Sequence, residues 1–171
     1  LAWLISTGVG GKQSLAGNTL FVIALFASVL LHEAGHALVA RRFGIQTVEI
    51  VMLPLGGLTR LERQPSGAEE FWVSLAGPLV NFALGGTLMG WTYWHGGALS
   101  MEHWENISDD NIASRLAVAN LALALFNLLP AFPMDGGRVM RSLLAARRPY
   151  EEATRLTARL GTAIAAAMGL Y

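Results

Sequence analysis

The sequence predicts a mainly α-helical membrane protein: a polytopic bundle of transmembrane helices with a small re-entrant β-hairpin or strand loop. Hydrophobic residues make up 53% of the 171-residue chain and charged residues only 14%, whereas an average soluble domain is about 25% charged. Several apolar segments approach or exceed the length that crosses a bilayer. Arginines gather in the segments that join them on one side. We therefore expect one transmembrane domain, residues 1–171, in a multi-pass protein of the cell membrane.

The first half of the chain predicts two helical segments and a strand loop. Residues 1–10 are too short to cross a bilayer, and we expect them to end a truncated first span. Residues 19–43 form a complete span, which Gly44 ends. Residues 46–63 favour strand around the Gly56-Gly57 turn signal, and their apolar side chains predict that the loop dips back among the helices. An ordinary interfacial loop is the alternative.

The second half predicts two further complete spans and two flanking helices. Residues 67–94 form a span that ends in aromatic residues typical of a membrane interface. Residues 111–129 form the next span, before Pro130 stops the regular helix. A basic cytoplasmic helix is expected at 138–148, and residues 153–171 are expected to form a further span that is cut short.

The distribution of basic residues predicts the orientation. One side of the expected bundle carries most of the arginines, whereas the opposite loops hold only Lys12 and the span-flanking Arg115. Basic residues favour the cytoplasmic side, so the span at 19–43 is expected to run from outside to inside. The arginines on the cytoplasmic side are Arg41, Arg42, Arg60, Arg63, Arg138, Arg141, Arg147 and Arg148.

The pentad His32-Glu33-Ala34-Gly35-His36 lies inside the apolar span at 19–43. Residues four apart share one face of a helix, so both imidazoles can bind one Zn²⁺ ion while Glu33 reaches a water at the metal. Two histidines at this depth are costly unless they are paired or bound to metal. His32 lies about 13 Å from the Arg41 end at 1.5 Å per residue, in the cytoplasmic half. A chance pentad is the alternative.

A hydrolytic zinc site needs a third protein ligand, and Asp135 is the best candidate. The chain has no cysteine, so the ligands must come from His, Asp or Glu. Asp135 follows the span at 111–129 on the pentad's own side, among prolines and glycines that let the backbone turn inward. Its alternative role is to cap the next helix. The weaker candidates are Glu49, Glu62, His95 and His103.

The chemistry of these residues predicts peptide hydrolysis. Glu33 would act as general base on the water and then pass the proton to the leaving amine. Asn81 and Asn127 are amides inside expected spans, where they either contact substrate or bond between helices. Nothing predicts a nucleic-acid surface, because the net charge is zero and basic runs with aromatics are absent.

Several segments together resemble the site-2 protease family of intramembrane zinc metalloproteases. They follow the family's order over about residues 20–148: the pentad with its flanks at 30–37, the Gly56-Gly57 loop, Ala-Gly-Pro-Leu-Val-Asn at 76–81, and Asn-Leu-Leu-Pro-Ala-Phe-Pro-Met-Asp-Gly at 127–136. The resemblance implies that His32, His36 and Asp135 are zinc ligands and Glu33 is the catalytic residue. It also implies that Gly56-Gly57 holds an unwound substrate as an added strand and that Asn81 positions substrate.

The same resemblance implies the substrates and the missing parts. The family cleaves transmembrane segments of single-span, membrane-tethered regulators within the lipid bilayer. Its common Asn-Pro-Asp-Gly reads Phe-Pro-Met-Asp-Gly at 132–136, a variant of branches that carry a CBS pair, so a regulatory domain absent from this chain is expected.

Two rivals remain at this point. The first is a non-catalytic membrane zinc-binding protein or metal transporter, and the second is a scaffold that holds a partner helix through Gly77, Gly85 and Gly86. A transporter is expected to carry polar residues across a whole span, whereas the ligands here cluster near one face.

Overall fold

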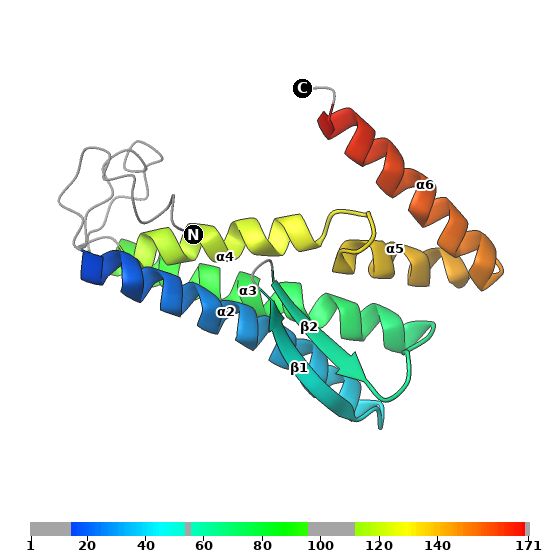
Figure 1. The fold of residues 1–171 in the computed structure, drawn as a ribbon, viewed down its shortest axis with the longest axis horizontal. Coiled ribbons are helices and arrows are strands. Elements are labelled where there is room, and N and C mark those ends of the chain that lie inside the picture. The colour runs from blue at the N-terminus through cyan, green and yellow to red at the C-terminus, as the bar shows by residue number, and fades with distance from the viewer. Residues whose placement is uncertain (1–14, 54–55, 96–111, 170–171) are drawn as a thin grey trace.

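The computed structural model describes residues 15–53, 56–95 and 112–169 and is mainly helical (Figure 1). The expected segment at 1–10, as well as His103, lies outside the described residues. The elements, in chain order, are α2 (Leu15–Arg42), β1 (Thr47–Leu53), β2 (Gly56–Leu61), α3 (Ala68–Trp94), α4 (Ile112–Asn127), α5 (Asp135–Ala145) and α6 (Tyr150–Gly169).

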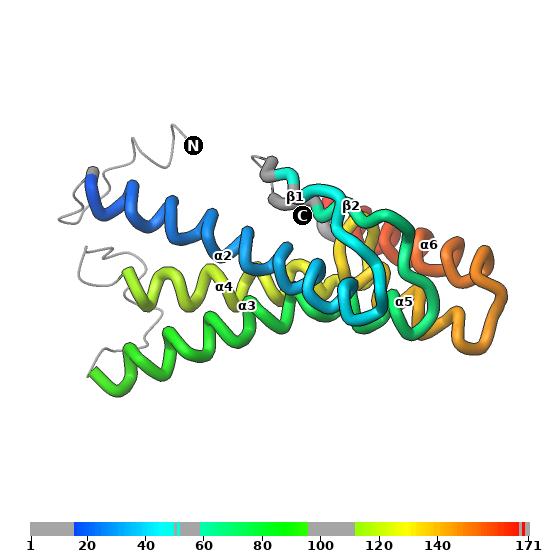
Figure 2. The backbone as a smooth tube through the Cα atoms, turned by 90° about the horizontal axis from the view of Figure 1, so that it is seen from below, coloured from blue at the N-terminus to red at the C-terminus, as the bar shows by residue number. Residues whose placement is uncertain are grey.

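Helices α2, α3 and α4 lie side by side and alternate in direction (Figure 2). Two helices in the described part of the chain are long and apolar enough to cross a membrane: Ala16–Arg42, with mean hydropathy 1.7, and Ala68–Trp94, with mean hydropathy 1.3. Each has 27 residues, which at 1.5 Å per residue gives about 40 Å, against a hydrocarbon layer of about 30 Å. The described helix α4 is shorter, with 16 residues.

Small and polar residues let helices α2, α3 and α4 pack closely together. A Cβ atom built at Gly35 of α2 would lie 2.8 Å from Val80 Cγ2 of α3, so only glycine permits this close approach. Between α2 and α4, the Asn120 side-chain amide donates a hydrogen bond to Ser28 Oγ at 3.1 Å. Close backbone contact and interhelical hydrogen bonds are typical of helix packing in membranes. Gly35 therefore lies on the face of α2 that meets α3, and Ser28 lies on the face that meets α4.

Strands β1 and β2 form a two-stranded antiparallel hairpin beside the C-terminal half of α2 (Figure 1). The register runs from Thr47 opposite Leu61 to Leu53 opposite Gly56, with an irregularity near the open end. Leu61 packs against a buried cluster of Ala40, Ile45 and Val73. This apolar contact docks the hairpin on α2 and the start of α3.

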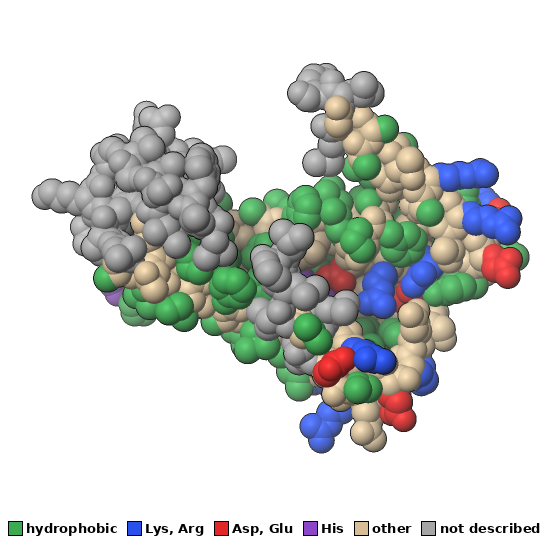
Figure 3. Space-filling model, viewed as in Figure 1, with side chains coloured by type: hydrophobic (Ala, Val, Ile, Leu, Met, Phe, Trp, Pro, Cys, Tyr) green, Lys and Arg blue, Asp and Glu red, His purple; other side chains and the backbone are tan. Residues whose placement is uncertain are grey.

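Helices α5 and α6 extend the molecule beyond the three long helices, and α5 packs on both α3 and α6. Both begin three residues earlier than expected, at Asp135 rather than 138 and at Tyr150 rather than 153. Charged side chains gather over this end and the hairpin (Figure 3). Helix α6 is not among the candidate spans of the described chain; its first half carries Glu151, Glu152, Arg155 and Arg159.

Candidate metal centre

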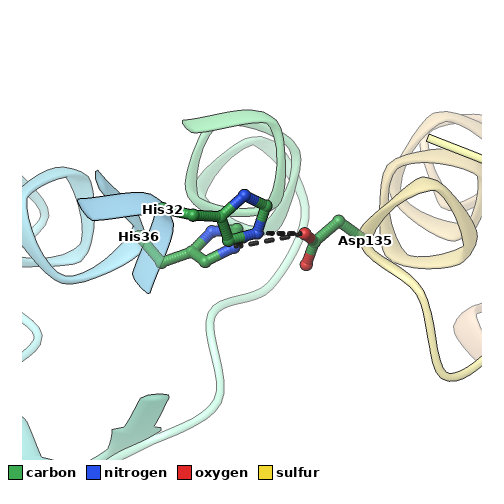
Figure 4. Close-up of side chains that lie close together, drawn as sticks. All are labelled: His32, His36 and Asp135. Carbon is green, nitrogen blue, oxygen red and sulfur yellow. Dashed lines mark hydrogen bonds and ion pairs between the residues drawn. The ribbon is translucent and has the colours of Figure 1, made fainter. Parts of the chain in front are cut away.

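Two elements far apart in the chain bring three side chains to one point (Figure 4). Helix α2 carries His32 and His36 one turn apart, and Asp135 faces them from the first turn of α5. Asp135 Oδ2 lies 3.1 Å from His32 Nε2 and 3.2 Å from His36 Nε2. The two Nε2 atoms lie 3.1 Å apart. In the described part of the chain, these residues form the group of His, Asp and Glu side chains able to hold a metal ion.

The triangle of ligand atoms has the size that a tetrahedral zinc site needs. Bonds of about 2.0 Å at tetrahedral angles separate neighbouring ligand atoms by about 3.3 Å. The measured edges of 3.1–3.2 Å are close to that value. His32 and His36 are only 5% and 7% exposed, so water hardly competes for these atoms. Two imidazoles and one carboxylate are also a donor set that zinc accepts.

A hydrogen bond to α3 sets the protonation pattern of His36. Its Nδ1–H donates to the backbone carbonyl of Val73 at 2.6 Å. In the neutral ring this leaves the lone pair on Nε2, the atom that faces Asp135 and His32. The His32 Nδ1 atom is buried and has no hydrogen-bond partner in the described structure. Helix α3 therefore prepares at least one histidine for metal binding.

Asp135 is turned toward the histidines and does not cap its own helix. The N-cap of α5 is Met134, and no side-chain hydrogen bond caps this end. Burial raises the pKa of the Asp135 carboxyl, but while Nε2 of His32 and of His36 carries a proton, hydrogen bonds and charge interactions with these rings outweigh burial and lower that pKa to about 2. The carboxylate is therefore ionised at neutral pH, as a metal ligand must be.

Two glycines make room for this arrangement. A Cβ atom at Gly77 of α3 would lie 2.5 Å from His32 Nε2 and 2.7 Å from its Cδ2, and it would also collide with His36 Nε2. A Cβ atom at Gly136 would collide with the carbonyl groups of Leu128 and Leu129. The first glycine leaves space at the ligand triangle, and the second lets α5 start close to the end of α4. The sequence predicted Gly77 only as a packing residue.

The carboxylate of Glu33 is buried and meets the hairpin. Glu33 is 7% exposed, and Thr59 of β2 donates its hydroxyl hydrogen to Glu33 Oε2 at 2.6 Å. Sequence reasoning missed Thr59. Side chains alternate between the two faces of a strand, so Thr59 shares a face with Leu61, which packs on the core. This alternation could have identified Thr59 as a residue that faces the helices.

A buried ion pair supports the segment that carries Asp135. Arg141 of α5 donates from Nε to Glu70 Oε1 of α3 at 3.0 Å and also from Nη2. Its guanidinium lies 5.1 Å from the ring centroid of Phe132 and 4.9 Å from that of Tyr150. One side chain thus connects α3, α5, α6 and the loop before Asp135. The sequence predicted only that Arg141 lies on the cytoplasmic side; it did not predict that the side chain is 12% exposed and paired with Glu70.

The proposed substrate-binding residues lie at separate places in the fold. Asn81 is 1% exposed and lies one turn beyond Gly77 on α3, and its Oδ1 atom has no hydrogen-bond partner in the described structure. Asn127 is the last residue of α4. Gly56 and Gly57 begin β2 and pair with the last two residues of β1.

The weaker candidates for a third ligand have other surroundings. Glu49 accepts a hydrogen bond from Arg60 at 3.1 Å on the exposed face of the hairpin. Glu62 is exposed at the end of β2. His95 stacks on Trp91 at the far end of α3. The structure thus favours Asp135 over these three.

The fold and this site define a helical protein in which two histidines of an H-E-x-x-H helix and a distant aspartate could together hold a metal ion. Comparison with known proteins agrees: the sequence model described as "Peptidase family M50" matches residues 20–97 and 95–168. The chain belongs to this family.

Individual relatives carry related names. A zinc metalloprotease of Methanocaldococcus jannaschii is 36% identical over 162 residues, which cover 92% of this chain and 45% of that protein. Stage IV sporulation protein FB of Bacillus subtilis is 28% identical over 159 residues, which cover 92% of this chain and 51% of that protein. The chain thus spans about half the length of these relatives.

A solved structure also matches. The site-2 protease from Methanocaldococcus jannaschii superposes with a TM-score of 0.65 at 36% identity, covering 85% of this chain and 63% of that chain. This chain and that protease therefore share the arrangement of their helices as well as part of their sequence.

Proposed function

We propose that this protein is an intramembrane zinc-dependent endopeptidase that cleaves transmembrane segments of membrane-tethered regulatory proteins. The observation that carries the proposal is the triangle of His32, His36 and Asp135, with Glu33 beside it in a helix long enough to cross a bilayer. The names of the relatives, zinc metalloprotease and site-2 protease, support the same activity.

The residues of the site have distinct roles in this reaction. His32, His36 and Asp135 would hold the zinc ion, with His36 kept in orientation by the Val73 carbonyl. When bound, zinc would supply Lewis-acid chemistry, polarising the scissile carbonyl and acidifying a water. Glu33 would take a proton from the water that attacks the carbonyl carbon and would deliver it to the amine nitrogen as the C–N bond breaks. Burial of the site limits access of bulk water to the reacting groups.

Substrate would bind between the hairpin and the helices. We propose that the backbone of Gly56 and Gly57, at one end of an edge strand, pairs with an unwound substrate segment, which thereby joins the sheet as a further strand. The buried Oδ1 atom of Asn81 can accept a hydrogen bond from the substrate backbone. Asn127, at the end of α4, is the second amide proposed to contact substrate.

The proposed setting is a cell membrane crossed several times by one core formed by residues 1–171. All described arginines except Arg115 lie at the end of α2, in or beside the hairpin, or in α5, α6 and the turn between them, which supports a cytoplasmic location for this end under the positive-inside rule. His32 then lies in the cytoplasmic half of the bilayer, with the hairpin re-entrant beside it. Single-span proteins are the proposed substrates.

The proposal is tested by comparing wild-type protein with Glu33→Gln. Each is purified, its bound zinc is measured, and it is incubated in lipid vesicles with a panel of single-span substrates. We expect equal zinc in both and cleavage by the wild type alone, because the amide cannot accept the proton. Cleavage by Glu33→Gln, or a wild type without bound metal, would contradict the proposal. Equal zinc with no cleavage by either protein would favour a non-catalytic zinc protein or a transporter.

A further inference from the structure

The contact between Thr59 and Glu33 joins the hairpin to the proposed general base. Thr59 Oγ1 lies 2.6 Å from Glu33 Oε2 and 3.3 Å from the Glu33 backbone carbonyl. A hydroxyl has one hydrogen to donate, and the shorter distance assigns it to the carboxylate. A distance of 2.6 Å is at the short end of the range for a hydrogen bond donated by a hydroxyl.

The hairpin also docks through apolar packing. Leu61, two residues further along β2, already packs against the buried cluster under the hairpin. Thr59 lies on the same face of β2, two residues closer to the turn between the strands. Its hydroxyl therefore contributes a directional hydrogen bond to the contact rather than apolar area. This bond is made to the carboxylate of Glu33, which lies between the proposed metal ligands in the sequence.

We propose that Thr59 is a positioning residue for Glu33. Its hydroxyl holds Oε2, so that the remaining oxygen, Oε1, is presented to the water and then to the leaving nitrogen. A free glutamate side chain samples several rotamers, and a base that is held in one of them before the reaction loses no further rotamer freedom in the transition state. This inference rests on the proposed function.

The same bond connects two proposed tasks. Gly56 and Gly57, which are proposed to hold substrate, lie on the strand that carries Thr59. A substrate segment that pairs with β2 would therefore bind to the element that orients the base. If Thr59 positions Glu33, its loss should slow the chemical step. Substrate affinity should change little, because the Thr59 hydroxyl bonds to Glu33 and not to the substrate.

The test compares three variants with the wild type in lipid vesicles, using a substrate that the wild type cleaves. Thr59→Val removes the hydroxyl and keeps the volume, whereas Thr59→Ser keeps the hydroxyl. Thr47→Val makes the same exchange on β1, at the open end of the hairpin. Bound zinc and the unfolding temperature are measured for each, and Thr59→Ala replaces the valine variant should that fail to fold.

We expect kcat of Thr59→Val to fall by about 10–100-fold, the usual effect of losing a partner behind a reacting group, with KM within about twofold and bound zinc unchanged. Thr59→Ser should recover most of kcat, and Thr47→Val should behave as wild type. A Thr59→Val enzyme with the kcat of Thr47→Val would overturn the role of Thr59. So would equal losses in the serine and valine variants, or a loss confined to KM. Failure to find any substrate that the wild type cleaves in the panel of single-span proteins would instead count against the proposed function.

Discussion

Replacement of Gly77 by alanine tests the geometry of the metal centre more sharply than removal of a ligand. The new Cβ atom would lie 2.5 Å from His32 Nε2, whereas ordinary contacts begin at 3.4 Å. The imidazoles would therefore have to retreat by about 0.9 Å, several times the roughly 0.2 Å within which metal–ligand distances are held. We expect zinc affinity to fall by about 100-fold or more, equivalent to about 2.7 kcal/mol at 1.36 kcal/mol for each factor of ten.

Helix α3 provides the matched control for this variant. A Cβ atom at Gly86 meets nothing within 4 Å, so Gly86→Ala raises helix propensity equally and leaves the site alone. Zinc affinity is measured by competition with a chelator, and helix content by circular dichroism. Tight zinc binding by Gly77→Ala, equal to that of Gly86→Ala, would refute the assigned position of the ligand atoms.

Three further predictions concern the support and charge of the site. Gly136→Ala should prevent folding or strongly lower the unfolding temperature, because its Cβ atom would collide with backbone carbonyls that cannot move aside; thermal scans in detergent would check this. Arg141→Leu should destabilise the protein by about 3–5 kcal/mol, since it leaves Glu70 buried without its cation; a combined Glu70→Leu, Arg141→Leu variant should recover much of the loss in denaturant titrations. Asp135→Asn should retain the fold and lose most of its zinc, because the ligand loses its charge; stable zinc binding by this variant would contradict the assigned ligand.

The local part of the site could be predicted from sequence, because its geometry follows from helix periodicity. Residues 32 and 36 share one face of any helix, so the paired imidazoles needed no tertiary information. Asp135 could be selected as the third ligand because the apolar spans restrict which loops reach the same side of a bilayer. The structure brings these three residues to within hydrogen-bond distance.

The contacts between elements could not be predicted in the same way. The position of Gly77 against the ligands depends on how α2 and α3 pack, and the contact of Thr59 with Glu33 depends on how the hairpin docks. Both arise from side-chain packing that a single sequence does not encode locally. The pairing of Arg141 with Glu70 could not be predicted either, because the distribution of arginines along the chain does not show which of them are buried.

The central claim is that one zinc ion is held by His32, His36 and Asp135. Anomalous diffraction at the zinc edge from crystals of the full chain would test it directly. We expect one strong peak about 2.0 Å from each of the two Nε2 atoms and from Asp135 Oδ2, and no peak there in Asp135→Asn crystals. Zinc bound elsewhere, or an Asp135 side chain directed away from both histidines, would contradict the claim.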